Sequence, residues 1–253
     1  MKHSDLAVES AHIPAGTSGT RCVSRTIGGV KITDIRLSNS AARTISRHPG
    51  RYITLEGDPA GNALPALLKR ALEQLLPPTG KILAAGLGNP DITRDRLGAL
   101  TVRRLSAKSG KRYSLAAIET DVALHTGIET AALVRSAARE MGACAIIAVD
   151  SLCCDDPGRL YRTVQLTDAG ITPGSGAAAP RRGLSERSAG IPVIAVGVPS
   201  AALLSSITGD QAHQRFLAAP SDEDVQSLIW ADCIAAAISA VIPVSYTHLR
   251  AHE

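Results

Sequence analysis

The feature that most restricts the fold is a series of short, continuous apolar runs, each followed by a turn and then by a helical pattern. The runs lie at 82–87, 144–149 and 191–196. A strand that is apolar at every position is buried on both faces, which is typical of a parallel sheet. Apolar residues at helical spacing follow at 95–107 and 128–141. Strands that alternate with helices predict an α/β fold, with a mainly parallel sheet flanked by helices.

The remaining segments complete a single predicted domain, residues 1–243. Residues 1–25 are polar and rich in Gly and Ser, which predicts an extended or mobile arm. No linker long enough to separate a second domain follows. Periodicity predicts further strands at 30–37, 51–56, 113–118 and 161–166, and further helices at 62–76, 200–217 and 221–241.

The last ten residues, 244–253, share none of the periodicity of the apolar segment before them. They resemble the translation of a transposase-type sequencing-library adapter. We therefore interpret 244–253 as an adapter artefact and leave it out of the fold prediction. Two of the seven histidines belong to this segment, so five remain for any functional site.

The composition excludes several function classes. Aromatic residues make up 2% of the chain and the net charge is +4, so we expect no base-stacking surface and no direct nucleic-acid partner. No apolar run reaches the ~18 residues of a membrane span, which predicts a cytoplasmic protein without a membrane partner. The five cysteines lack CxxC spacing and predict free thiols. Cys153 and Cys154 have no histidine nearby in sequence to activate a nucleophile, so we interpret them as structural.

Two aspartates follow predicted strands where a catalytic crevice is expected. In open α/β sheets that crevice lies at the carboxyl ends of the strands. Asp150 directly follows the run 144–149, and Asp95 begins the helix after the turn at 86–89. An apolar environment and a second nearby carboxylate both raise a carboxyl pKa, so such a pair can activate water with one group and protonate the leaving group with the other. Helix capping is the alternative role for either aspartate.

Glycine-rich turns supply candidate substrate or oxyanion loops. Glycine allows a tight turn whose exposed N–H groups can bind a carbonyl or an oxyanion. Neither turn has the spacing of a phosphate-binding loop, and a solvated loop without function is the alternative. The candidate residues are Gly86, Gly88 and Asn89 in the first turn, and Asp168, Gly174 and Ser175 in the second.

Seven segments spread over about residues 4–242 carry a family resemblance when they are taken in order. They lie at 4–9, 50–56, 86–98, 126–130, 146–150, 168–176 and 190–199. In this order they resemble the germination proteases of endospore-forming bacteria, which are endopeptidases that degrade small acid-soluble spore proteins. Seven ordered segments are a more specific signal than any one of them.

The resemblance implies a fold, an assembly and a catalytic pair. The family's α/β sandwich is similar to that of hydrogenase maturation proteases, a phosphorylase/hydrolase-like fold, and its members are homotetramers made as zymogens. Its two catalytic aspartates correspond to Asp95 and Asp150, in an atypical aspartic-protease arrangement that needs no cofactor and no metal. The matching segments also place Thr126, Gly127 and Glu129 among the implied substrate-binding residues.

Self-processing is a further implication of the resemblance. Family members carry a propeptide before the Asp-Leu-Ala-Val-Glu motif, and cleavage between Asp5 and Leu6 would remove five residues here. The segment 4–9 itself resembles the recognition sequence of the substrates, which are cut after an acidic residue. We therefore expect an endopeptidase of small acid-soluble spore proteins, located in the cytoplasm of the forespore or spore core.

Three other functions agree with parts of the sequence. A metal-dependent, nickel- or zinc-type endopeptidase could use the same acidic pair, although His213 is the only histidine between Asp150 and the adapter-like segment. The string 86–90 resembles the start of peptidyl-tRNA hydrolase, but the stretch 93–96 lacks the histidine of that enzyme. A non-catalytic binding protein of the same fold is the third alternative.

Overall fold

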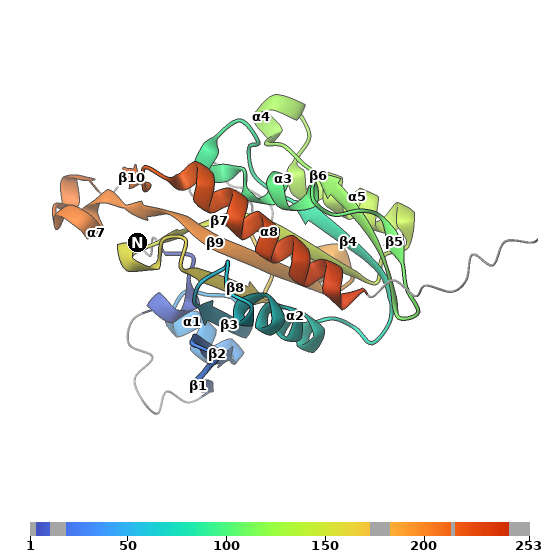
Figure 1. Ribbon diagram of the computed structural model, residues 1–253, viewed down its shortest axis with the longest axis horizontal. Coiled ribbons are helices and arrows are strands. Elements are labelled where there is room, and N and C mark those ends of the chain that lie inside the picture. The colour runs from blue at the N-terminus through green and yellow to red at the C-terminus, as the bar shows by residue number, and fades with distance from the viewer. Residues whose placement is uncertain (1–3, 11–18, 173–182, 214–215, 243–253) are drawn as a thin grey trace, which may run out of the picture.

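The computed structural model describes residues 4–10, 19–172, 183–213 and 216–242. Its centre is a sheet of ten strands (Figure 1). Four strands at the middle pair in parallel, which is the part of the sheet that the apolar runs predict. In spatial order these strands are β6 (Tyr113–Glu119), β4 (Gly80–Gly86), β7 (Ala145–Cys154) and β9 (Val193–Leu203).

Antiparallel strands extend this parallel centre on both sides, so the sheet is mixed. The short β5 (Lys108–Ser109) pairs with β6, and β10 (Leu217–Ala218) pairs with β9. On the other side of β9 the sheet continues through β8 (Thr163–Thr167), β3 (Gly50–Glu56), β2 (Val30–Leu37) and β1 (Thr20–Ile27). The α/β class and the helix-flanked sheet are confirmed, while parallel pairing is restricted to the centre.

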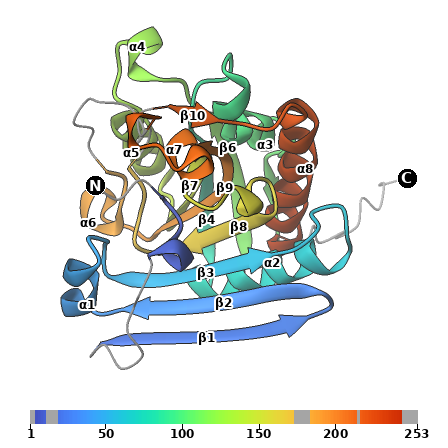
Figure 2. The same cartoon turned by 90° about the vertical axis from the view of Figure 1, so that its left-hand side faces the viewer.

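Helices cover both faces of the sheet. Figure 2 shows α2 (Ala63–Leu75), α3 (Leu97–Val102) and α8 (Glu223–Val241) on one side, and α5 (Thr130–Met141) on the other. The shorter helices are α1 (Asn39–Thr44), α4 (Ala123–Thr126), α6 (Glu186–Ala189) and α7 (Leu204–Thr208). Single 3-10 turns occur at η1 (Ala7–Glu9), η2 (Thr93–Asp95), η3 (Pro157–Arg159) and η4 (Gln211–His213).

Alternation along β7 divides the core into two layers. Ile147 and Val149 belong to the larger cluster, which also contains residues of α2, α3 and α8. Ile146 and Ala148 belong to the cluster on the α5 side. Successive side chains of a strand point to opposite faces. Asp150 is therefore the next residue of β7 on the α5 side.

The helix α8 is a core element. Its Trp230 is fully buried and donates a hydrogen bond from the indole N–H to the Tyr161 carbonyl at 2.8 Å. By length and composition alone the helix could also cross a bilayer, with a mean hydropathy of 1.3 over 18 residues, but half of that window is buried inside the protein. Burial of this kind is expected of a core helix in a soluble domain.

The predicted helix at 200–217 is wrong, and part of the predicted N-terminal arm forms regular structure. A helix was expected at 200–217, but β9 runs to Leu203 and is buried along its whole length, and α7 is only five residues long. Pairing with β7 and β10 stabilises the extended chain there. The predicted arm 1–25 contains regular structure, since Leu6 in the segment 4–10 is fully buried and residues from Thr20 onward form β1. The artefact assigned to 244–253 lies outside the described residues.

The strand β1 escaped prediction because its side chains are almost all exposed, so no apolar alternation marks it. It forms by pairing with β2 through a two-residue hairpin loop. Both loop residues, Gly28 and Gly29, have positive φ, at 56° and 79°. This is the backbone of a type I′ turn, for which glycine pairs are favoured.

Candidate functional site

The strands that precede the two predicted aspartates are neighbours in the sheet. β4 and β7 pair in parallel with Gly86 opposite Val149, so their carboxyl ends reach the same edge. The turn after β4 is attached to β7, because the Leu87 N–H donates to the Val149 carbonyl at 2.8 Å. The turn at 86–89 and Asp150 are therefore fixed relative to each other.

The Asp95 carboxylate closes the turn after β4. Its Oδ2 accepts a hydrogen bond from the Asn89 N–H at 2.8 Å. Gly88 permits this closure, since its φ is +100° and a Cβ there would lie 2.0 Å from the Asp95 carbonyl oxygen. The amides of Leu87 and Asn89 are thus bonded within the protein, and the Gly86 carbonyl accepts from Thr120 Oγ1 at 2.8 Å. These contacts pack the turn at 86–89 closely against Asp95 and the end of β7.

Asp150 lies in a cavity on the α5 side of the sheet. The residue is only 4% exposed, and its Oδ1 accepts a hydrogen bond from the Ser151 N–H at 2.9 Å. The cavity has a volume of about 180 Å³ and contains Asp150 but not Asp95. Its lining combines residues from the sheet, from the loop after α1 and from the N-terminal segment: Asp5, Arg47, His48, Tyr52, Asp150, Leu152, Gln165, Thr167, Gly170 and Ala195.

Gln165 shares a position along the sheet with Asp150. Gly197 of β9 is opposite Asp150 of β7 on one side and opposite Gln165 of β8 on the other. Because strands lie about 4.8 Å apart, the Cα atoms of Asp150 and Gln165 are about 10 Å apart across β9. Both side chains line the cavity. Local sequence does not indicate this position, since Gln165 is a polar residue in an alternating strand, a pattern typical of a solvent-facing side chain.

The N-terminal segment 4–9 is bound at the same place. Arg47 holds its backbone, donating from Nη1 to the Asp5 carbonyl at 2.9 Å and from Nη2 to the Leu6 carbonyl at 2.6 Å. The Leu6 side chain is fully buried against Cys154 and Ala202. Burial lowers the pKa of Arg47 while the nearby Asp5 and Glu9 charges raise it, and arginine stays protonated at neutral pH.

Both acidic side chains of this segment are bound by backbone amides. Asp5 Oδ2 accepts from the Cys153 N–H at 2.8 Å. Glu9 accepts from the Asp155 N–H at 2.7 Å and forms an ion pair with Arg159 at 3.3 Å. Hydrogen bonds to ionised carboxylates are stronger than those between neutral groups. The segment is therefore recognised through its carboxylates as well as through its backbone.

Several residues expected at the site lie elsewhere. Thr126 and Gly127 are exposed, and neither they nor Glu129 lines the cavity. Asp168 is also exposed, and its Oδ1 accepts a hydrogen bond from the Arg51 N–H at 2.7 Å, which fastens β8 to β3. Gly174 and Ser175 lie outside the described residues. The residues that sequence reasoning missed are Arg47 and Gln165.

Thiols and metal ligands were weighed as alternatives from the sequence. Burial raises the pKa of the Cys153 thiol to about 12, with a further contribution from the Asp5 charge. Burial also raises the pKa of Cys154, which is a structural neighbour of Leu6. A thiol of this kind is a poor nucleophile at neutral pH. Among the described residues, no group of three or more His, Cys, Asp or Glu side chains could hold a metal ion.

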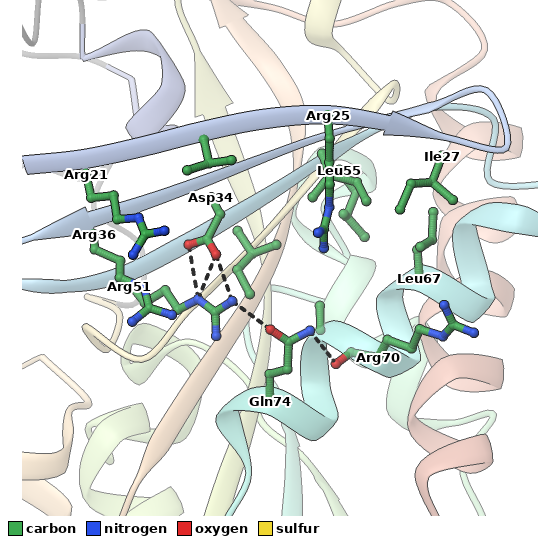
Figure 3. Close-up of a pocket in the computed structure, with 14 residues that line it drawn as sticks. Arg21, Arg25, Ile27, Asp34, Arg36, Arg51, Leu55, Leu67, Arg70 and Gln74 are labelled. Carbon is green, nitrogen blue, oxygen red and sulfur yellow. Dashed lines mark hydrogen bonds and ion pairs between the residues drawn. The ribbon is translucent and has the colours of Figure 1, made fainter. Parts of the chain in front are cut away.

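A larger groove lies on the opposite face of the sheet. It has a volume of about 320 Å³ and runs between β1–β3 and α2 (Figure 3). Arg51 forms a forked ion pair with Asp34 there and also bonds Gln74 at 2.6 Å. The other arginines of the groove are Arg21, Arg25, Arg36 and Arg70. None of the expected site residues that the structure describes lines this groove.

Comparisons with known proteins agree on one family. The family model described as germination protease matches residues 5–217. A germination protease of Geobacillus sp. (strain WCH70) is 31% identical over 210 residues, which cover 74% of this chain and 56% of the relative. That of Oceanobacillus iheyensis is 30% identical over 241 residues (81% and 65%), and that of Priestia megaterium 31% over 233 residues (81% and 63%). The chain thus spans roughly three fifths of the length of these curated relatives.

Proposed function

The chain belongs to the germination protease family, and from this membership we propose that it is an endopeptidase that degrades small acid-soluble spore proteins during germination. The observation that carries the proposal is a cavity lined by both the buried Asp150 and Asp5, which belongs to the docked segment 4–9. A cavity with a peptide segment along its wall and a buried carboxylate beside it has the parts that peptide hydrolysis needs.

In the proposed reaction Asp150 and Asp95 share the acid–base work. One carboxylate removes a proton from the attacking water, and the other, in its protonated form, donates a proton to the leaving amine. Asp150 is the member that lines the cavity. The link from Asp95 through the turn at 86–89 to Val149 supports a shared edge for the two residues.

The wider biology is part of the same proposal. The family resemblance supports a homotetramer that is made as a zymogen and acts in the cytoplasm of the forespore or spore core. The segment 4–9 is proposed to be cut between Asp5 and Leu6 during self-processing, and its Asp5 lines the same cavity as Asp150. The cavity could therefore receive the chain's own segment and a substrate in turn.

Cleavage of a purified small acid-soluble spore protein tests the proposal. Asp150→Asn and Asp95→Asn should each lower the rate at least ~10²-fold, the usual scale for loss of acid–base catalysis. Asp232→Asn is the matched control, because Asp232 is an exposed residue paired with Arg104 outside the cavity. Full activity in Asp150→Asn would refute the assignment. Cleavage that persists after exhaustive chelation would remove the metal-dependent alternative.

A further inference from the structure

The peptide bond between Asp5 and Leu6 is held in an unusual way. Its carbonyl oxygen, which belongs to Asp5, accepts two hydrogen bonds, from Arg47 Nη1 at 2.9 Å and from Gln165 Nε2 at 3.1 Å. Two side-chain donors that meet on one carbonyl oxygen polarise the carbonyl and can stabilise the negative charge that forms there when a nucleophile adds. One of the two donors carries a full positive charge.

The rest of the segment is bound as a peptide ligand would be. The Asp5 N–H donates to the Cys153 carbonyl at 2.9 Å, and the Cys153 N–H returns a bond to the Asp5 carboxylate at 2.8 Å. The Gln165 side chain contacts the backbone on both sides of Leu6, because its Nε2 donates to the Asp5 carbonyl and its Oε1 accepts from the Ala7 N–H at 2.6 Å. These contacts fix the backbone on both sides of the Asp5 carbonyl.

The catalytic carboxylate proposed above lies on the same side of the sheet. Asp150 and Gln165 flank Gly197 on neighbouring strands, and both line the cavity with Asp5. A water molecule between Asp150 and the Asp5 carbonyl carbon would have a general base on one side. The carbonyl oxygen would be held by donors on the other side. Acyl transfer to water uses a base and a set of oxyanion donors on opposite sides of the reacting carbonyl.

We propose that Arg47 and Gln165 are catalytic residues that bind the carbonyl oxygen of the bond to be cut, in a substrate segment that takes the place of residues 4–9. The inference rests on the proposed peptidase function. Asp150 takes a proton from water as the oxygen adds to the carbonyl carbon, and the π electron pair moves to the carbonyl oxygen between Arg47 and Gln165. Collapse of this oxyanion breaks the C–N bond, and the amine leaves with a proton from the acid.

The same contacts define the substrate. The residue before the cut bond presents its carboxylate to the Cys153 N–H, as Asp5 does. The residue four positions later presents a carboxylate to the amides of Asp155 and Asp156 and to Arg159, as Glu9 does. Between them, an apolar side chain fills the site of Leu6. The test peptide therefore carries both acidic residues.

Kinetics on a synthetic peptide that contains Ser-Asp-Leu-Ala-Val-Glu, with neutral flanks, test the roles of the two donors. Gln165→Glu has nearly the same shape and keeps an acceptor for the amide that Ala7 now supplies, but it has no N–H to donate. We expect its kcat to fall at least ~10²-fold, as on removal of an oxyanion donor elsewhere, with KM within about threefold of the parent. Arg47→Lys keeps the positive charge but loses the planar guanidinium group with its several fixed N–H donors, so its kcat should fall as well.

Matched controls come from the opposite face of the sheet. Gln74→Glu and Arg36→Lys change the same residue types in the arginine groove and should leave kcat and KM unchanged. Thermal melting and the oligomeric state of every variant show whether it is folded. If Gln165 were only a structural anchor, its replacement would lower the melting temperature or raise KM and would leave kcat unchanged.

The outcomes separate this inference from the proposed function. If the parent cleaves between Asp and Leu, Asp150→Asn is inactive and Gln165→Glu retains the parent kcat, the role of Gln165 is refuted while the peptidase stands. If Arg47→Lys and Gln165→Glu both lose kcat and remain folded, the inference is supported. If the parent cleaves neither the peptide nor a small acid-soluble spore protein, both proposals fail.

Discussion

Replacement of Leu6 by alanine should release the N-terminal segment without unfolding the domain. Leu6 is fully buried, and the residues of its cluster are few, namely the buried Cys154 and Ala202 with the partly buried Val8, Leu152 and Leu160. This cluster is separate from the two large core clusters on either side of the sheet. The loss should therefore act on docking of the segment rather than on global stability.

The magnitude follows from the burial. A buried Leu→Ala change costs about 2–5 kcal/mol. The low end applies here, about 2–3 kcal/mol, because the cluster is small and can partly close over the gap. Since 1.4 kcal/mol is a factor of ten, the docking equilibrium should fall by about 30- to 140-fold. The bonds from Arg47 and Gln165 to the backbone of the segment remain in place.

Hydrogen exchange of single amides measures this change. The Ala7 N–H donates to Gln165 Oε1 at 2.6 Å, so its protection should fall by about 30- to 140-fold in Leu6→Ala. The Ile147 amide, in the centre of β7, should change little. Val8→Ala is the matched control, because Val8 is only half-buried and its truncation should cost less than about 1 kcal/mol.

Two results would refute the reasoning. Equal loss of protection at Ala7 and Ile147 would show that the segment unfolds only together with the domain. Unchanged protection at Ala7 would show that Leu6 is not the anchor. In the expected case, the freed cavity should also accept a substrate peptide more readily, which appears as a lower KM than that of the parent chain.

Further predictions concern the turn and the thiols. Gly88→Ala should lower the free energy of unfolding by more than about 3 kcal/mol in urea titrations, because the new Cβ would lie 2.0 Å from the Asp95 carbonyl oxygen. Gly142→Ala has a positive φ of 64° but open space, so it should cost only about 1–2 kcal/mol; equal losses would contradict the argument. The pKa of Cys153 is raised to about 12, so only about one thiol in 10⁴ is ionised at pH 8. Iodoacetamide at pH 8 should label the exposed Cys22 first and leave activity intact; inactivation that parallels labelling of Cys153 would refute this.

Periodicity in the sequence predicts two kinds of element. One kind buries a single face, and the other is a short strand that is buried on both faces. Alternation marks β2 at its observed bounds, Val30–Leu37, and helical spacing marks α2 at Ala63–Leu75 within about one residue. Periodicity fails where burial carries no period. All of β9 is buried, from Val193 to Leu203, so its second half is indistinguishable in sequence from a buried helix.

The candidate site likewise contains one residue that the sequence predicts, Asp150, and one that it does not, Gln165. Asp150 could be predicted from the sequence because it directly follows a continuous apolar run, and that run places it at the end of a buried strand. Gln165 could not be predicted, because a polar residue between Val164 and Leu166 is typical of the solvent-facing position of a half-buried strand. In the structure every residue of β8 is buried. Its outer face is covered by the segment 4–9, a contact between residues about 160 positions apart that no local pattern encodes.

A polar residue on a covered strand needs a partner, and this requirement connects the fold to the proposed chemistry. Gln165 is only 5% exposed, and an unsatisfied buried amide would cost about 1–3 kcal/mol. The Ala7 N–H and the Asp5 carbonyl satisfy it when the segment is docked. When the segment leaves, Gln165 and Arg47 lose those partners together, and another extended peptide can restore the same bonds. A peptide with an N–H and a carbonyl in these positions fits better than water, because both groups arrive on one backbone. The proposed substrate would therefore satisfy both groups with its backbone alone, whatever its side chains are.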